Sequence, residues 1–592
     1  MVMRMRYRNL IFVFAFVSSF YRATGGEVKT ADDIFNIEES GRADGQFITR
    51  KGLINQISQA LEGVASITED ILNVILFPVK ELIKLDQKAI VENQHKKDIA
   101  TVRLGSPVCD GEMEFRERRF TIVKDAQERF LEMDLDDEDV LEIAFCTSGG
   151  GVRAKAYSLG ACVGADKVGL LDTAMCISGL SGSTWFIAPW ISSGLPICEY
   201  RKRGISEIFA GIDISSSKDI VTMLDAIWVK FAYNQHLNIV DLYGGILANN
   251  FLRGLGVKQN MVYLSDQQKT LSDGIFPLPV YTAVLGNRDM PNYWFEFTPF
   301  EVGSRWLGAY VPSWAFGRKF KNGKSKSSAP EMSLGFLMGI WGSAFAASFE
   351  EAYEKGIKNM KLPKFLKGVP GAKLIFNALK KTLAKLAYFS DLGELRVAWG
   401  QVFNYVYKMK ESSFKKSKDI KLVDAGVDFN NPVFATYRKP PYGDAPDVIF
   451  VFDSGGAVGI EELKLLKEYA CQYNLKFPEI DEENYEQRAI TIFEDKDDPS
   501  IPVVIYLPRV ADPYMFGRYA KDEQLGPFVQ KLQDFDIEEA IKSGFAGTFN
   551  FEYMREEAEL IADLAEFNIR AVAYKIKDAL KRRLKLKRRI RH

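Results

Sequence analysis

A serine flanked by small residues is the strongest candidate for chemistry in this chain. Ser181 stands in the run Gly-Leu-Ser-Gly-Ser, after the apolar stretch 174–177 and before Thr-Trp-Phe-Ile. Small neighbours permit a sharp strand-to-helix turn that exposes the serine oxygen, as in a nucleophile elbow, with Ser183 where a second glycine would stand. The pattern predicts that Ser181 attacks an ester carbonyl. Ser343, in Trp-Gly-Ser-Ala-Phe, lacks this pattern and is not expected to be a nucleophile.

A glycine-rich turn lies upstream of this serine. The apolar run 142–147 breaks into Ser-Gly-Gly-Gly-Val-Arg and re-enters helix at Ala154. Backbone N–H groups at such a helix start favour an anion, so Gly150 and Gly151 are predicted to donate to the oxyanion that forms during ester attack. A phosphate or nucleotide loop is the alternative, but the run lacks both the P-loop lysine and the G-x-G-x-x-G spacing.

The serine needs a base, and histidine is scarce. Of His95, His236 and His592, only His236 is a serious candidate. Two aspartates at predicted strand ends compete with it: Asp424 before Ala-Gly, and Asp453 before Ser-Gly-Gly. The local pattern alone does not separate these two. A carboxylate at its ordinary pKa of about 4 is a weak base, so burial must raise that pKa for either aspartate to serve.

The elements that must hold these residues are predicted to be buried strands and helices. Apolar runs of strand length cover 277–284, 421–423 and 448–452, and the last two end at the candidate aspartates. With 592 residues, 47% of them hydrophobic and 26% charged, the chain can bury a large core. A formal net charge of −1 excludes bulk attraction to nucleic acid, so no nucleic-acid partner is expected.

The six cysteines show no spacing typical of a metal or redox site. Three of them lie in the apolar runs around the two turns, so we expect the cysteines to be buried as small hydrophobic residues and not to form disulfides. No metal and no cofactor are expected.

The N-terminus is typical of a secretory signal peptide over residues 1–26. Arg4, Arg6 and Arg8 precede the apolar run 10–17, and small residues follow it. The run is short for a membrane span, and an uncleaved membrane anchor is the alternative. We therefore expect export, with peripheral association to a membrane.

Two strongly basic segments indicate contact with an anionic surface. Residues 355–385 hold nine lysines and no acidic residue, interleaved with bulky apolar side chains, which favours a membrane-touching cap over an exposed connection. Residues 575–592 hold ten Lys or Arg and one acid, Asp578. A solvated tail is expected there, with attachment to anionic lipid or RNA as the alternative.

Taken together, the two glycine-rich turns resemble the catalytic domain of the cytosolic phospholipase A2 family. Ser-Gly-Gly-Gly-x-Arg followed by Gly-Leu-Ser-Gly-Ser-Thr-Trp carries the resemblance, and the pairing is more specific than either half. The family's D-S-G-x-x-F-N-x-P segment, which holds its catalytic aspartate, is matched by residues 424–432, with Ala425 in place of serine. The resemblance selects Asp424 as the base over Asp453, which matches a structural aspartate of the family.

The resemblance also implies roles for basic residues. Arg153, beside the glycine-rich loop, is suited to grip a lipid phosphate near the scissile ester, with a structural ion pair as the alternative. Lys415, Lys416 and Lys418 resemble the phosphoinositide-binding lysines that precede the aspartate in animal relatives. A solvated surface run is the alternative for these lysines.

The family implies an α/β fold with a mixed central sheet flanked by helices. Residues 111–574 are expected to be the catalytic domain, with an inserted cap over about 300–415. A helical region, 27–110, is expected before this domain, and the basic tail, 575–592, after it.

The implied reaction is hydrolysis of the acyl ester of a glycerophospholipid at a membrane surface, through an acyl-Ser181 intermediate. Because no calcium-binding C2 module precedes the domain in this sequence, no calcium requirement is expected. A lysophospholipase or acyltransferase is the first alternative. A catalytically silent membrane-binding effector is the second, although such a protein needs neither the serine nor the aspartate.

Overall fold

The computed structural model describes the chain from residue 93 to residue 591, with gaps. The described residues are 93–209, 229–230, 233–236, 239–255, 259–286, 293–344, 399–456, 459–481, 483, 485–542, 544–548, 550–551 and 553–591. The expected signal peptide or anchor at 1–26 and the basic segment 355–385 lie outside them. Among the described helices, none combines the length and the apolar character needed to cross a membrane.

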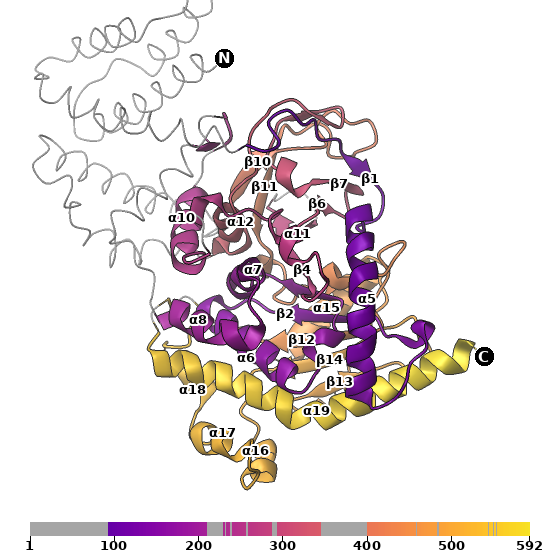
Figure 1. The fold of residues 1–592 in the computed structure, drawn as a ribbon, viewed down its shortest axis with the longest axis vertical. Coiled ribbons are helices and arrows are strands. Elements are labelled where there is room, and N and C mark those ends of the chain that lie inside the picture. Colours follow the sequence, from indigo (N-terminus) through magenta and orange to yellow (C-terminus); the bar gives the residue numbers. More distant parts are fainter. Residues whose placement is uncertain are drawn as a thin grey trace, which may run out of the picture.

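Twelve strands of the described chain form one mixed sheet (Figure 1). Five neighbouring strands at its centre are parallel. In sheet order they are β4 (Leu278–Leu285), β3 (Cys176–Gly179), β2 (Ile143–Thr147), β12 (Val448–Asp453) and β14 (Val503–Pro508). All residues of these strands are buried, which is why their sequences are almost continuous apolar runs.

Antiparallel strands extend the sheet on both sides. Beyond β14 lies β13 (Thr491–Phe493), and beyond β4 lie β5 (Trp294–Phe297), β6 (Glu301–Ser304), β7 (Ala309–Pro312) and β1 (Arg103–Leu104). β10 (Gly400–Phe403) pairs with β11 (Asp419–Asp424), which pairs with β4. A separate hairpin is formed by β8 (Phe320–Lys321) and β9 (Lys324–Ser325).

The strands do not agree with two of the predicted regions, the inserted cap and the N-terminal helical region. β6 and β7 fall within the range expected for the inserted cap, yet they continue the main sheet. The described part of the expected helical region 27–110 contains turns and β1, and its first helix begins only at Asp110.

Helices flank the sheet (Figure 1). Two helices, α16 (Pro513–Tyr519) and α17 (Gly526–Leu532), instead pack against the C-terminal helix on its side away from the sheet (Figure 1). The other helices of the described chain are α5 (Asp110–Leu131), α6 (Gly151–Lys167), α7 (Thr184–Ser193), α8 (Ile197–Phe209), α10 (Ile239–Phe251), α11 (Gln267–Thr270), α12 (Leu334–Trp341), α15 (Ile460–Gln472), α18 (Ile537–Lys542) and α19 (Arg555–Arg591).

The long C-terminal helix α19 packs closely along α6. A Cβ atom at Gly160 would lie 2.0 Å from the Ala562 carbonyl oxygen, and one at Gly164 would lie 2.9 Å from the Glu566 carbonyl oxygen. Glycine at these two positions of α6 therefore allows an approach that any side chain would block.

The basic tail expected at 575–592 is the second half of α19 and is not a solvated tail. Arg583 is 2% exposed and pairs with Asp447, and Arg588 pairs with Asp139. Because these acids stand just before β12 and β2, the basic end of α19 is bound to the ends at which the central strands begin.

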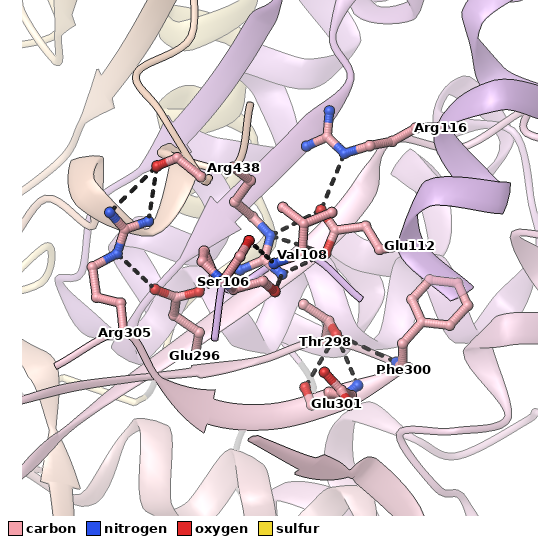
Figure 2. A network of polar contacts seen from close by, with 12 residues as sticks. Ser106, Val108, Glu112, Arg116, Glu296, Thr298, Phe300, Glu301, Arg305 and Arg438 are labelled. Atoms are coloured by element: carbon pink, nitrogen blue, oxygen red, sulfur yellow. Dashed lines mark hydrogen bonds and ion pairs between the residues drawn. The ribbon is translucent and has the colours of Figure 1, made fainter. Parts of the chain in front are cut away.

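A buried network of charged side chains joins α5 to the segment that follows β11 (Figure 2). The Arg438 guanidinium donates to the carboxylates of Glu112 and Glu296, and Arg116 also donates to Glu112. Burial raises the pKa of Glu112, but the charges of Arg438 and Arg116 outweigh burial and hold that pKa below its usual value. Arg305 adds contacts to Glu296 and to the carbonyl that precedes Arg438.

The six cysteines are free, as expected. Cys109, Cys146, Cys162 and Cys176 are buried. The prediction of burial is wrong for Cys198 and Cys471, which are exposed.

Candidate active site

Strand β4 brings the two candidate catalytic residues together. Along one edge its first half pairs with β3 and its second half with β11, while β5 occupies the other edge. β3 is parallel to β4, and its last residue, Gly179, pairs with Tyr281. β11 is antiparallel to β4, and its last residue, Asp424, pairs with Ala283, two residues after Tyr281. The ends of β3 and β11 therefore face each other, and Ser181 follows the first end while Asp424 closes the second.

Ser181 adopts the strained conformation of a tight elbow. Its backbone φ is 51°, in the left-handed region that residues other than glycine rarely adopt. The Ser183 hydroxyl stabilises the turn, because it accepts from the Leu180 N–H at 3.1 Å and lies 3.0 Å from the Thr147 carbonyl. The Ser181 hydroxyl donates to Asp424 Oδ2 at 2.8 Å.

Asp424 is 1% exposed, and its carboxylate accepts several hydrogen bonds. Besides the bond from Ser181, Oδ1 accepts from the Gly426 N–H at 2.9 Å, and the Ala344 N–H also donates to the carboxyl group. Burial raises the pKa of Asp424 to about 7, although these hydrogen bonds act in the opposite direction. A carboxyl group with such a pKa can exchange a proton with a serine hydroxyl near neutral pH.

The glycine-rich loop lies directly against the elbow. Gly150 is the N-cap of α6 and Gly151 its first residue, with φ values of 134° and 64°. A Cβ atom at Gly182 would lie 1.9 Å from the Gly151 carbonyl oxygen, which shows how closely the two turns approach. N–H groups at the start of a helix have no acceptor within it, so this loop can present donors to an oxyanion beside Ser181.

Arg153 is fully buried behind the same loop. Its guanidinium donates to the carbonyl oxygens of Ser454 at 2.8 Å and Ala546 at 2.6 Å, and to the Thr548 hydroxyl at 3.1 Å. Burial lowers its pKa to about 10. The side chain thus ties the loop to two other segments, and its contact with a lipid phosphate stays a prediction.

His236, the alternative base, lies away from Ser181. Its Nε2 is 2.8 Å from Asp419 Oδ1, at the first residue of β11, whereas Asp424 is the last. At about 3.3 Å per residue, five residues of strand separate these two aspartates by roughly 16 Å. The structure therefore brings Asp424, and not His236, to the serine.

Asp453 is also buried at a strand end, but its carboxylate has other partners. Oδ1 accepts from the Gly455 N–H at 2.8 Å and Oδ2 from the Tyr506 hydroxyl at 2.6 Å. These bonds fix the turn after β12, which also provides the Ser454 carbonyl that Arg153 contacts. Asp453 therefore fixes the turn to which Arg153 ties the glycine-rich loop, and it does not contact Ser181 in the described structure.

Two residues that hold the candidate site in place, Ser343 and Asn430, were not predicted from the sequence. The Ser343 hydroxyl accepts from the Asp424 N–H at 3.0 Å, so this serine anchors the backbone of the aspartate. Asn430 joins the aspartate turn to the glycine-rich loop through two hydrogen bonds. Its side-chain Nδ2 donates to the Gly149 carbonyl at 3.2 Å, and its backbone carbonyl accepts from the Gly149 N–H at 3.1 Å. Asn430 lies within the F-N-x-P pattern, which was the available signal.

The lysine cluster before β11 is exposed. Lys415, Lys416 and Lys418 all face solvent, and Lys415 donates to the Lys410 carbonyl at 3.0 Å. Binding of phosphoinositide here stays a prediction. Within the described ranges, no group of three or more His, Cys, Asp or Glu side chains is arranged to hold a metal ion.

Comparison with known families identifies the chain. Residues 143–484, more than half of its length, match a family model described as the lysophospholipase catalytic domain. The chain belongs to this family. The match begins at β2 and contains Ser181, Asp424 and the glycine-rich loop.

Relatives in this family carry the name cytosolic phospholipase A2. The zeta protein of Mus musculus is 26% identical over 562 residues, which cover 83% of this chain and 64% of that protein. The zeta protein of Homo sapiens is 28% identical over 536 residues, which cover 79% of this chain and 60% of that protein. The chain thus spans less than two thirds of these relatives. The predicted resemblance to the cytosolic phospholipase A2 catalytic domain is confirmed.

Solved structures show the same fold. Human GIVD cytosolic phospholipase A2 matches with a TM-score of 0.66 and 22% identity, over 83% of this chain and 69% of that one. The same human protein in complex with methyl gamma-linolenyl fluorophosphonate matches with a TM-score of 0.61. The predicted α/β class, a mixed central sheet flanked by helices, is therefore confirmed.

Proposed function

We propose that this chain hydrolyses the acyl ester of glycerophospholipids, at the sn-2 position or in lysophospholipids, with Ser181 as the nucleophile and Asp424 as the base. One observation carries the proposal: a serine on a strained elbow donates at 2.8 Å to a buried aspartate, beside a glycine-rich helix start. Family membership and relatives named cytosolic phospholipase A2 support the class of reaction.

In the proposed reaction, Ser181 Oγ attacks the ester carbonyl carbon while its proton passes to the Asp424 carboxylate. The carbonyl oxygen becomes an oxyanion, which the N–H groups of Gly150 and Gly151 stabilise. The tetrahedral intermediate then expels the glycerol oxygen, which takes the proton from Asp424. Water next attacks the carbonyl carbon of acyl-Ser181 and gives a proton to Asp424. The fatty acid then leaves, and Asp424 returns a proton to the Ser181 oxygen.

The membrane contacts belong to the same proposal. The exposed Lys415, Lys416 and Lys418 are proposed to meet anionic lipid headgroups without calcium. Contact of Arg153 with the substrate phosphate requires that one of its three hydrogen bonds to the protein open, so we propose that its main contribution is to fix the loop. Liposome flotation with and without a chelator tests the attachment, and release of the protein by the chelator would contradict calcium independence.

A lysophospholipase is the second candidate, because the matching family model carries that description. The same dyad serves both reactions, and an acyltransferase would use the same acyl-serine with an alcohol in place of water. A silent effector is disfavoured, since lipid binding alone does not require a strained serine bonded to a buried aspartate.

The decisive experiment is the release of fatty acid from phospholipid vesicles and from lysophospholipid by the purified chain. We expect Ser181→Ala and Asp424→Asn to abolish release from both substrates, while His236→Ala retains it. Full activity of Ser181→Ala would reject the nucleophile. Loss of activity in His236→Ala, with Asp424→Asn still active, would replace the dyad.

A further inference from the structure

A buried tyrosine that packs against the helix following Ser181 has a hydroxyl without a hydrogen-bond partner in the described structure. Tyr243, on α10, is 2% exposed. Its phenol oxygen is inaccessible to solvent and has no hydrogen-bond partner within the described part of the chain. A buried hydroxyl without a partner is costly, and near the candidate active site a bound ester can supply the missing partner.

Close helix packing joins α10 to α12. A Cβ atom at Gly244 would lie 2.5 Å from the Gly335 carbonyl oxygen, and one at Gly339 would lie 2.7 Å from the Val240 carbonyl oxygen. The backbones of α10 and α12 therefore touch on either side of Tyr243 in sequence. Just beyond the end of α12, Ser343 holds the backbone of Asp424.

The ring of Tyr243 also packs against the helix that follows the elbow. Its centroid lies 6.4 Å from that of Trp185 on α7, at an interplanar angle of 69°. A Cβ atom at Gly342 would lie 2.7 Å from the Trp185 ring, so the same indole contacts both Tyr243 and the residue that caps the end of α12. Tyr243 therefore contacts the helix that follows Ser181, and its own helix packs against the one that leads to Ser343, the residue bonded to the Asp424 backbone.

The two sides of the elbow offer different chemistry. α6 contacts α7 on one side, and α10 with α12 contact it on the other (Figure 1). An ester bound at Ser181 must turn its carbonyl oxygen towards the N–H groups at the start of α6. Its leaving oxygen must turn towards Asp424, which returns the proton. Asp424 ends β11, which contacts α12, and α12 packs against α10, the helix that carries Tyr243.

We propose that Tyr243 is a further catalytic residue, whose phenol O–H hydrogen-bonds the leaving glycerol oxygen of the ester. This inference rests on the proposed function. As the carbon–oxygen bond breaks, the electron pair goes to the glycerol oxygen, the Asp424 carboxyl group transfers its proton to that oxygen, and Tyr243 donates a hydrogen bond while keeping its own proton. In the second half of the reaction, the attacking water occupies the position of the glycerol oxygen and accepts the hydrogen bond from Tyr243.

The electrostatic surroundings suit a donor that does not ionise. Burial raises the pKa of Tyr243 well above its ordinary value, and the nearby Asp424 raises it further. The phenol therefore stays protonated while Asp424 alone exchanges the proton. A hydrogen bond to a developing negative charge is worth more than one to a neutral group, so the bond contributes most in the transition state.

The test compares kcat/KM of Tyr243→Phe on two esters of the same fatty acid. One is lysophosphatidylcholine, whose leaving group is a glycerol alkoxide, and the other is the 4-nitrophenyl ester, whose leaving group is stable without a donor. Loss of a hydrogen bond to a charged group costs about 10- to 100-fold in rate. We expect a loss of this size on the glycerol ester and little change on the nitrophenyl ester.

Tyr310→Phe is the matched control. Tyr310, on β7, is likewise 2% exposed and its hydroxyl likewise lacks a hydrogen-bond partner within the described ranges. Removal of this hydroxyl is expected to leave both rates unchanged. Thermal unfolding of both variants checks that each folds.

The outcomes separate the inference from the proposed function. An equal loss on both esters, or no loss on either, overturns the role of Tyr243 while the phospholipase proposal stands. A wild-type chain that cleaves neither the glycerol ester nor phospholipid vesicles overturns the proposed function itself.

Discussion

At Asp424, burial and hydrogen bonding act in opposite directions on one carboxyl group. Burial disfavours the charge, while the N–H groups of Gly426 and Ala344 and the hydroxyl of Ser181 favour it. The balance leaves the pKa at about 7 and not near the ordinary value of an aspartate. A base must be ionised to accept a proton, and the strongest base that is still ionised at neutral pH has a pKa near 7.

This balance predicts the direction of the pH dependence. The Asp424 carboxylate accumulates as pH rises through about 7, so kcat/KM for fatty-acid release is expected to rise over the same range and level off above it. Measurement from pH 5 to pH 9 checks the profile. His236→Ala is the control and should keep the rise, because the proposed reaction gives this histidine no part. A rate that stays constant down to pH 5 would contradict the raised pKa.

The candidate catalytic residues could be predicted from sequence better than the residues that hold them in place. Ser181 and the glycine-rich loop follow from local pattern, because each turn is built from consecutive residues. The choice of Asp424 over Asp453 required family resemblance, since both end buried strands and only their three-dimensional partners differ. The role of Ser343 could not be predicted, because its contact with Asp424 joins residues 81 positions apart.

At the scale of elements, the strands were recognisable from apolar runs, whereas the role of the C-terminal basic residues was not. Charge composition suggested a solvated tail, yet Arg583 and Arg588 meet acids that are distant in sequence. The packing of α19 on α6 is likewise determined by shape: Gly160 and Gly164 permit a close approach that periodicity does not reveal. Because α6 begins at the glycine-rich loop, this packing supports one side of the candidate active site.

Gly160→Ala tests that packing. The added methyl group would lie 2.0 Å from the Ala562 carbonyl oxygen, so α6 and α19 must separate. We expect a loss of roughly 1–3 kcal/mol in the free energy of unfolding, as in other overpacked cores. Gly517→Ala on α16 is the control, because a Cβ atom there meets nothing within 4 Å. This second change is expected to stabilise the chain by about 0.4–1 kcal/mol. Chemical denaturation measures both, and equal effects would contradict the packing argument.

For the molecule as a whole, the buried charges of Figure 2 connect regions that are far apart in sequence. Glu112 belongs to α5, Glu296 to β5, and Arg438 to the segment that follows the aspartate turn. One end of that segment is therefore fixed at Asp424 and the other at Arg438. Between them, Asn430 holds the glycine-rich loop, so the network helps to position the donors predicted for the oxyanion.

Arg438→Ala is expected to destabilise the whole fold, because it leaves two buried carboxylates without their shared cation. Breaking a buried ion pair on one side costs about 3–5 kcal/mol, whereas an exposed pair is worth about 1 kcal/mol or less. Lys476→Ala, which removes the exposed pair with Asp498, is the matched control. Urea unfolding of the two variants measures the difference. A small loss in both would contradict the role assigned to the buried arginine.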